Sequence, residues 1–303
     1  KSLLKNVEFV NTLTGYIPNN NDLENEGVIQ IKKRKVLIGY RGNKISYSYG
    51  DLPQEKILIA KTMKNECSKR SIPCNISVDN SDRIYGKKWI KFLKSSKATL
   101  ATESGSNLFD YDGKYKKKFS NYLNKFPNAD YDSAKLSVLG SSREKKIMNQ
   151  ISPRIFEAIA CKTVLVLFEG NYSGILRRDI HYIALKKNFS NINDVFNKLR
   201  DDSYLQRMAD RTFDDIVRSE KYSYRAFVES IDRKIDSYIR ISNLKNSPEQ
   251  NFINYDINNQ PNRINSIFFI MYIYKLIPVS VMNLFTKFIK RIVKKIITKI
   301  YDS

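Results

Sequence analysis

The sequence ISPRIFEAIACKTVLVLFEGNYSG, residues 151–174, combines the patterns of a helix, a buried strand and a turn. Its first part carries apolar residues on one helical face, and Glu157 lies off that face. Residues 163–168 form a continuous run of apolar and β-branched residues, as expected of a parallel strand covered on both faces. The turn at residues 169–174 follows the carboxyl end of this strand, where open α/β sheets bind ligands. The stretch therefore predicts a parallel sheet with a site at this edge.

Glu157 is the first candidate for a ligand contact. A carboxylate accepts two hydrogen bonds at once, which suits the neighbouring hydroxyl groups of a ribose. The alternative is a surface glutamate on an ordinary amphipathic helix. This stretch alone does not decide between the two.

Strand and helix patterns alternate along the chain. Before this stretch, we expect strands at residues 36–40, 74–78 and 98–102, and helices at 53–69, 84–93 and 114–126. After it, we expect a strand at residues 180–185 and helices at 192–200, 204–218 and 224–241. This alternation predicts an α/β fold, a Rossmann-like doubly wound sheet.

The composition describes a folded and strongly basic protein. The 303 residues include 53 Lys and Arg against 31 Asp and Glu, a net charge of +22. This excess predicts attraction to polyanions, anionic lipids or phosphorylated ligands, without choosing among them. Three cysteines without CxxC spacing and a single histidine argue against a disulfide framework, a transition-metal site and a Ser-His-Asp triad. The cysteine usage fits a reducing cytosol.

The chain divides by composition into four parts. We expect a partial amino-terminal segment and linker at 1–35, a Rossmann-like domain at 36–242, a polar linker at 243–265 and amphipathic helices at 266–303. A start at Lys1 rather than Met suggests a fragment of a longer protein.

The last part has the pattern of a basic amphipathic helix in a membrane interface. Within residues 284–300 the apolar side chains form one stripe and Lys and Arg form the opposite face. Each basic residue near an anionic leaflet contributes about 1 kcal/mol to binding. We therefore expect residues 267–303 to hold a cytoplasmic protein on the inner face of the plasma membrane. The alternatives are a coiled-coil or core-docking helix, and a membrane span at 267–285.

Four segments resemble a known family in their order. They are GYRGN at 39–43, YGDLPQEK at 49–56, DRIYGKKWIKFLKSSKATLATESGSNLFDYDG at 82–113 and SPRIFEAIA at 152–160. Together they resemble the carboxyl-terminal half of GT-B glycosyltransferases, in particular the group-1-like enzymes of bacterial surface-polysaccharide synthesis. The resemblance spans about residues 36–230. It implies a Rossmann-like domain that binds a nucleotide-sugar donor, with no cofactor and no metal ion.

The resemblance also implies roles for three residues. Arg41 and Lys56 match the family's cations that neutralise the diphosphate, whose negative charge grows as the glycosidic bond breaks. A solvated helix residue is the alternative for Lys56. Glu157 matches the family's ribose-binding glutamate. The family often carries a second glutamate eight positions earlier, where this chain has Asn149, which cannot stabilise developing positive charge.

Further donor contacts are expected around these positions. Glu103 is a candidate for a sugar contact, with a turn-capping carboxylate as the alternative. Arg154, three residues before Glu157, would face the same ligand. The turn that would bring backbone N–H groups to phosphate or sugar consists of Gly170, Asn171, Tyr172 and Ser173.

Two other polar features are given structural interpretations. Asp110 and Asp112 have the spacing of a metal-binding DxD motif, but a tight turn ending at Gly113 is the simpler interpretation. His181 is expected to pack at the start of a strand. No catalytic base is assigned.

The leading hypothesis is transfer of a sugar from a nucleotide-sugar donor to a glycan or lipid-linked acceptor. The residues upstream of residue 36 are too few for an acceptor domain, so a partner domain or subunit is expected to supply that half. The first alternative is a non-catalytic sugar-nucleotide-binding module at the membrane. The second, a nucleic-acid-binding protein, has only charge and aromatic content in its favour, and no nucleic-acid partner is expected.

Overall fold

The computed structural model describes residues 9–17, 27, 29–140 and 148–243. The chain separates into two units, Lys1–Asp236 and Ser237–Ser303. The sheet and the sites discussed below belong to the first unit. The predicted amphipathic segment at residues 266–303 lies outside the described residues, and the predicted division of the chain into four parts stays a prediction.

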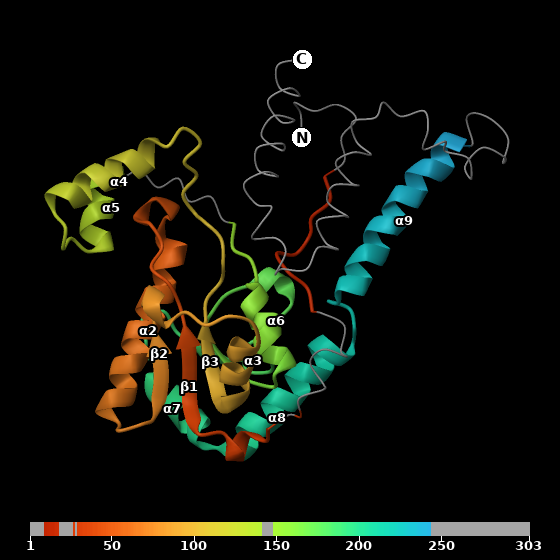
Figure 1. Cartoon of the computed structure of the whole chain (residues 1–303), viewed down its shortest axis with the longest axis horizontal. Helices are drawn as coiled ribbons and strands as arrows, with labels where there is room; N and C mark the ends of the chain where they lie inside the picture. Colours follow the sequence, from red (N-terminus) through yellow and green to blue (C-terminus); the bar gives the residue numbers. More distant parts are fainter. Residues whose placement is uncertain (1–8, 18–26, 28, 141–147, 244–303) are drawn as a thin grey trace, which may run out of the picture. The chain divides into compact units, whose positions relative to one another are not determined.

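A five-stranded parallel sheet forms the centre of the first unit (Figure 1). Its strands are β1 (Val36–Arg41), β2 (Cys74–Ser77), β3 (Ser96–Ala101), β4 (Val164–Phe168) and β5 (Ile183–Leu185). They lie in the order β2-β1-β3-β4-β5, and all neighbours are parallel. The chain moves outward from β1 to β2 and then returns to the other side of β1 for β3. The predicted α/β, Rossmann-like sheet is confirmed, and this reversal of direction creates a switch point between β1 and β3.

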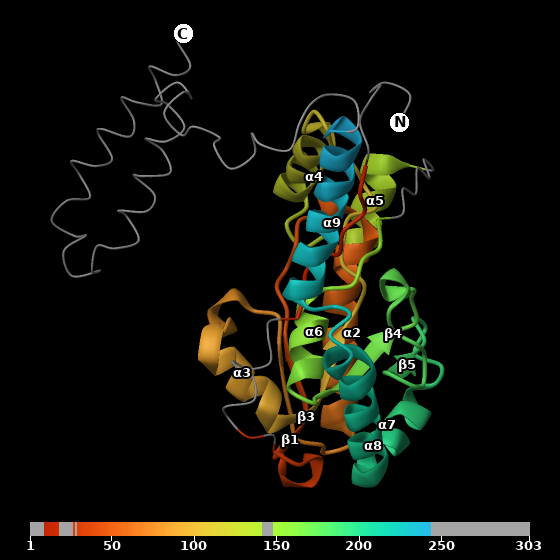
Figure 2. The same cartoon turned by 90° about the vertical axis from the view of Figure 1, so that its right-hand side faces the viewer.

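Helices cover both faces of the sheet. One face packs on α2 (Asp51–Lys69), α7 (Ile192–Arg200) and α8 (Asp202–Phe213), and the other on α3 (Gly86–Ser95) and α6 (Pro153–Ala160). Figure 2 shows α3 and α7 on opposite sides of the strands. Strand β4, which lies between β3 and β5, divides its side chains between the two layers, since successive residues point to opposite faces. Val164, Val166 and Phe168 enter the first core and Leu165 and Leu167 the second.

The elements outside these layers include one helix that the sequence patterns did not predict. The remaining helices are α4 (Lys114–Lys125), α5 (Tyr131–Leu139) and α9 (Tyr224–Asn243), and the π-helical turn η5 (Asp214–Arg218) continues α8. Helix α5 has Asp130 as its N-cap, whose side chain accepts the N–H of Ser133 at 2.8 Å. It escaped prediction because only Ala134 of the helix is buried, while Leu136 is 72% exposed, so no apolar stripe appears.

The basic cluster before β1 contains one buried residue, Arg34, which is 4% exposed. Its guanidinium donates to the carbonyl oxygens of Ser96 and Cys161 and to Thr163 Oγ1, at 2.9 to 3.0 Å. Ser96 and Cys161 are the C-cap residues of α3 and α6, where the helix dipoles are negative. Burial lowers the pKa of this guanidinium to about 10. Arg34 therefore stays charged at neutral pH and joins the amino ends of β1, β3 and β4.

We expect the substitution Arg34→Met to lower the free energy of unfolding by about 2–4 kcal/mol, because it leaves buried carbonyl groups without a donor. Urea denaturation followed by circular dichroism measures this change. The matched control is Lys35→Met, which removes the same charge from an exposed side chain. Equal effects of the two substitutions would contradict the role given to Arg34.

Candidate functional site

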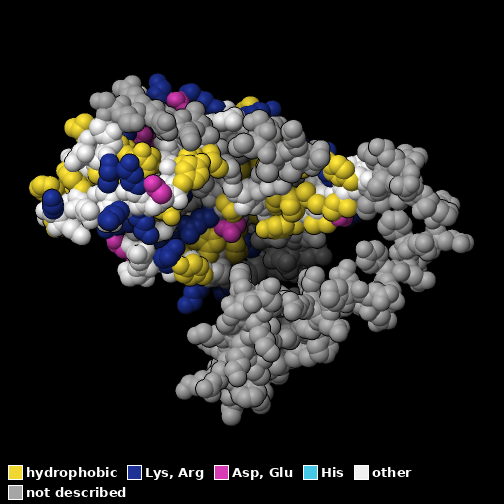
Figure 3. Space-filling model, turned by 90° about the horizontal axis from the view of Figure 1, so that it is seen from above, with side chains coloured by type: hydrophobic (Ala, Val, Ile, Leu, Met, Phe, Trp, Pro, Cys, Tyr) yellow, Lys and Arg dark blue, Asp and Glu magenta, His cyan; other side chains and the backbone are white. Residues whose placement is uncertain are grey.

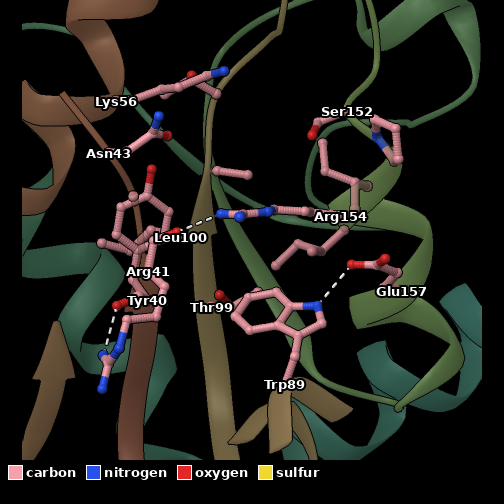
Figure 4. A pocket seen from close by; sticks show the side chains of 16 residues that line it. Tyr40, Arg41, Asn43, Lys56, Trp89, Thr99, Leu100, Ser152, Arg154 and Glu157 are labelled. Carbon is pink, nitrogen blue, oxygen red and sulfur yellow. Dashed lines mark hydrogen bonds between the residues drawn. The ribbon is translucent and has the colours of Figure 1, made fainter. Parts of the chain in front are cut away.

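A cavity of about 430 Å³ lies at the carboxyl edge of the sheet, at the switch point between β1 and β3. Its walls come from the ends of these two strands, from the start of α6 and from single side chains of α2 and α3. The side chains that argue for a ligand are Lys56, Trp89, Arg154 and Glu157 (Figure 4). This volume lies in the usual range of small-molecule sites, and open parallel sheets bind ligands at this position.

Two cations, Lys56 and Arg154, line the cavity from different elements. Lys56 on α2 donates to Ser104 Oγ at 3.2 Å, and Arg154 on α6 donates to the carbonyl oxygen of Arg41 at 2.6 Å. Neither forms an ion pair with a carboxylate in the part of the chain that the structure describes. Burial first, and then the charge of Arg154, lower the pKa of Lys56. An anion between the two cations would offset both the burial and the repulsion.

Helix α6 adds a third source of positive potential. It starts at the cavity with Ser152 as N-cap and Pro153 at its first position, and the side chain of Ser152 makes no capping hydrogen bond. A helix start carries partial positive charge and suits phosphate groups. The cavity therefore favours an anionic ligand at the end where Lys56, Arg154 and this helix start meet.

Glu157 supplies a negative charge at the same cavity. Its Oε2 accepts the indole N–H of Trp89 at 2.7 Å, a contact that joins α6 to α3. Arg154 lies over the ring of the same tryptophan, with 5.2 Å from the guanidinium carbon to the ring centroid. Figure 4 shows the acid and the guanidinium on different sides of the indole. Glu157 thus adds one acid to the two cations Lys56 and Arg154 at the cavity.

Arg41 lines the cavity, but its guanidinium is directed elsewhere (Figure 4). The group donates to the carbonyl oxygens of Asp82, Tyr40 and Asn75 and to Asn75 Oδ1, at 2.8 to 2.9 Å. It also lies 4.5 Å from the centroid of the Phe92 ring. An anion in the cavity would therefore meet Arg154 and Lys56 first. The diphosphate role expected of Arg41 stays a prediction.

The other predicted contacts gather around Glu103, outside the lining of the cavity. Glu103 is buried, and its Oε1 accepts the backbone N–H groups of Asn171 and Tyr172 at 3.1 and 2.9 Å. Its Oε2 accepts Asn149 Nδ2 at 2.7 Å. A Cβ at Gly170 would lie 2.8 Å from the carboxylate carbon, so this position has no room for a side chain. The contacts match the turn-capping alternative for Glu103.

The turn after β4 is therefore bound within the protein. The N–H groups of Asn171 and Tyr172, expected to meet a ligand, are directed at Glu103 instead. Ser173 Oγ accepts the backbone N–H of Ile151 at 3.0 Å. The turn shapes the neighbourhood of the cavity through these bonds, and direct contact of Gly170, Asn171, Tyr172 or Ser173 with a ligand stays a prediction.

Trp89 is the site residue that the sequence patterns did not single out. It appeared only as one of the apolar residues of a predicted amphipathic helix, for which core packing is the ordinary expectation. The one available signal was composition, since it is the single tryptophan of the chain and falls within a segment that carries the family resemblance.

The remaining polar candidates have structural partners. Asp110 accepts the backbone N–H groups of Tyr115 and Lys116, and Asp112 accepts that of Lys114, so both cap the start of α4. His181 is buried and pairs with Asp215 at 3.0 Å. Within the described ranges, the structure holds no group of three or more His, Cys, Asp or Glu that would bind a metal ion. None of the helices in those ranges is both long and apolar enough to cross a bilayer.

The surface at the carboxyl ends of the strands is basic. Figure 3 looks onto the carboxyl ends of the strands, and Lys and Arg side chains predominate there over acidic ones. Such a face attracts anionic molecules toward the cavity at low ionic strength.

Comparisons with known proteins give a limited result. No family model matches the chain, and no curated protein matches it. Several solved structures are similar, among them the crystal structure of TarM, which is 14% identical with a TM-score of 0.35. That match covers 68% of this chain and 37% of the TarM chain, so the chain spans well under half of its length. A likeness of this degree does not bear on activity.

Replacing Arg154 by Met should raise the pKa of Lys56 toward its ordinary value, because it removes the neighbouring positive charge. NMR titration of the lysine side-chain signals measures the shift. Arg83→Met, which removes the same charge from an exposed residue outside the cavity lining, serves as control. An unchanged pKa of Lys56 in the Arg154 variant would mean that the two cations do not share the cavity.

Proposed function

We propose that the cavity binds the nucleoside diphosphate part of a nucleotide-sugar, and that this chain is the donor-binding part of a glycosyltransferase. One observation carries the proposal: Lys56 and Arg154 meet at a sheet switch point beside Glu157. A nucleotide-sugar has two negative phosphates next to a neutral ribose with two hydroxyl groups. Two cations beside one hydrogen-bonding carboxylate complement that order of groups.

Each residue has a defined part in this proposal. Lys56, Arg154 and the start of α6 hold the diphosphate, and Glu157 accepts the ribose hydroxyl groups. When the bond to the sugar breaks, the diphosphate leaves with additional negative charge. Fixed cations stabilise that charge more strongly in the transition state than in the bound donor, which accelerates the reaction. The proposal requires no metal ion and no organic cofactor.

The acceptor half is proposed to come from a partner domain or subunit. The family resemblance supports a glycan or lipid-linked acceptor and a role in surface-polysaccharide synthesis. No catalytic base is assigned within the cavity. Tyr40 lines it, but burial raises the pKa of its phenol to about 12, so it stays protonated at neutral pH.

A non-catalytic sugar-nucleotide-binding module is the second candidate, and Asn149 favours it. Where the family often has a second acid, this side chain donates to Glu103 and offers no carboxylate to the cavity. Donor binding without hydrolysis or transfer, even with the acceptor half present, would select this candidate.

The decisive experiment is titration of the chain with UDP, GDP and CDP and their sugar conjugates. Calorimetry measures affinity, and fluorescence of Trp89, the single tryptophan, reports occupancy of the cavity. We expect saturable binding of one nucleotide, weakened at least about tenfold by Glu157→Ala or Arg154→Met, because each removes a charge-assisted contact. Arg83→Met should leave affinity unchanged. If no nucleotide binds, the proposal is wrong.

Membrane attachment is proposed through residues 267–303, on the cytoplasmic face of the plasma membrane. Deleting these residues should release the protein from vesicles that contain anionic lipid, because the deletion removes a cluster of basic residues. Sedimentation with vesicles measures the effect, and neutral vesicles are the control. Undiminished binding after the deletion would exclude the tail as the anchor.

A further inference from the structure

We infer that Trp89 is a positioning residue that keeps Glu157 and Arg154 apart, and that it thereby sets the preference of the site for a ribose over a deoxyribose. The inference rests on the proposed function for the identity of the ligand. The contact itself rests on geometry alone. No contact with a ligand is assigned to the tryptophan.

The starting point is the spacing of the two charged residues. Arg154 and Glu157 are three positions apart on α6, and oppositely charged side chains at this spacing meet on a helix surface. An ion pair would be the default in a site without a ligand. It would neutralise the guanidinium and occupy the acid. The described structure shows no ion pair between them, and Trp89 contacts both instead.

The indole uses two different parts for the two contacts. Its N–H group, which can only donate, holds Glu157 Oε2 at 2.7 Å, the length of a charge-assisted hydrogen bond. The ring holds the guanidinium of Arg154 through its negative π-face, at 5.2 Å. A single side chain therefore gives each charge a separate partner.

The position of the indole is itself fixed by packing. Trp89 stacks with Phe92 on the same helix, with 5.7 Å between ring centroids and an interplanar angle of 22°. The guanidinium of Arg41 in turn lies over the ring of Phe92, 4.5 Å from its centroid. The carbonyl oxygen of Arg41 accepts a hydrogen bond from Arg154. Arg154 is therefore held by two contacts, with the ring of Trp89 and with the carbonyl oxygen of Arg41. Glu157 depends on the indole N–H.

Removing only that N–H separates the two contacts. In Trp89→Phe the ring face under Arg154 is kept, but Glu157 loses its donor and is expected to turn toward Arg154. The acid would then be less available to ribose hydroxyl groups, and the guanidinium less available to the diphosphate. Two losses therefore follow from the absence of one hydrogen-bond donor.

The test compares the nucleoside diphosphate that binds best among UDP, GDP and CDP with its 2′-deoxy counterpart. We expect wild-type protein to bind the ribose form more tightly than the deoxyribose form. Trp89→Phe should lose about tenfold in affinity for the ribose form, and the ratio of the two affinities should fall toward one. Tyr85→Phe, at the start of the same helix and 64% exposed, is the control. A Trp89→Phe variant that keeps the wild-type preference overturns the inference.

A double-mutant cycle with Glu157→Gln separates positioning from general damage to the fold. A neutral amide does not pair with Arg154 as a carboxylate does, so Trp89→Phe should change affinity less than twofold in that background. The same loss in both backgrounds would show that Trp89 acts only through packing, and would overturn the inference. Thermal unfolding of each variant confirms that the compared proteins are folded.

The hydrogen bond can also be tested without any ligand. A chain with one tryptophan gives one indole N–H signal in a ¹H–¹⁵N NMR spectrum, and Glu157→Gln should shift it. An unshifted signal overturns the contact. If wild-type protein binds none of the nucleotides, the proposed function and the ribose preference fall together. The NMR result then still decides whether Trp89 holds Glu157.

Discussion

The placement of the two helices that carry the site depends on a buried guanidinium at the amino edge of the sheet. Arg34 carries a charge into the interior without a carboxylate partner among the described residues, and carbonyl groups at the ends of α3 and α6 stabilise it. Breaking such a set of bonds is costly, because the charge or the carbonyl groups would be left buried alone. These two helices also carry Trp89, Arg154 and Glu157 at the other edge. Arg34 anchors both helices and thus helps to fix the distance between Trp89 on α3 and the two charged residues on α6.

At the carboxyl edge of the sheet, acidic and basic side chains differ in their hydrogen-bond partners. Glu103 is bound by two backbone N–H groups and an amide, and Glu157 by an indole. Lys56 and Arg154 have only neutral acceptors among the residues described. The protein therefore gives these two acids hydrogen-bond donors, whereas Lys56 and Arg154 have no carboxylate partner among the residues described. This asymmetry is what makes an anionic ligand the natural occupant of the cavity.

The sequence predicted the strands and most helices because their residues are buried at regular spacing. Strand β4 (Val164–Phe168) is buried at every position, and helix α6, which contains Glu157, shows a clear apolar face. Helix α5 lacked that signal, because one buried alanine is too little to produce a stripe. The burial of Arg34 was equally invisible, since it stands among three exposed lysines.

The site was predictable only in part, for a geometrical reason. Residue type and motif order pointed to Lys56, Arg154 and Glu157, all of which line the cavity. They could not tell that Arg41 turns its side chain toward Asn75 in β2, because the direction of a side chain at a strand end depends on the neighbouring strand. Nor could they show that the turn after β4 donates to Glu103, since that bond joins residues 68 to 69 positions apart.

The bond network of Glu103 has a consequence for the energetics of binding. It ties the segment after β3 to the turn after β4, and Gly170 packs directly against the carboxylate. These segments next to the cavity are thus preorganised, and a ligand that enters loses little affinity to their ordering. Binding is then expected to leave the backbone of these segments in place, and to move only long side chains such as Lys56.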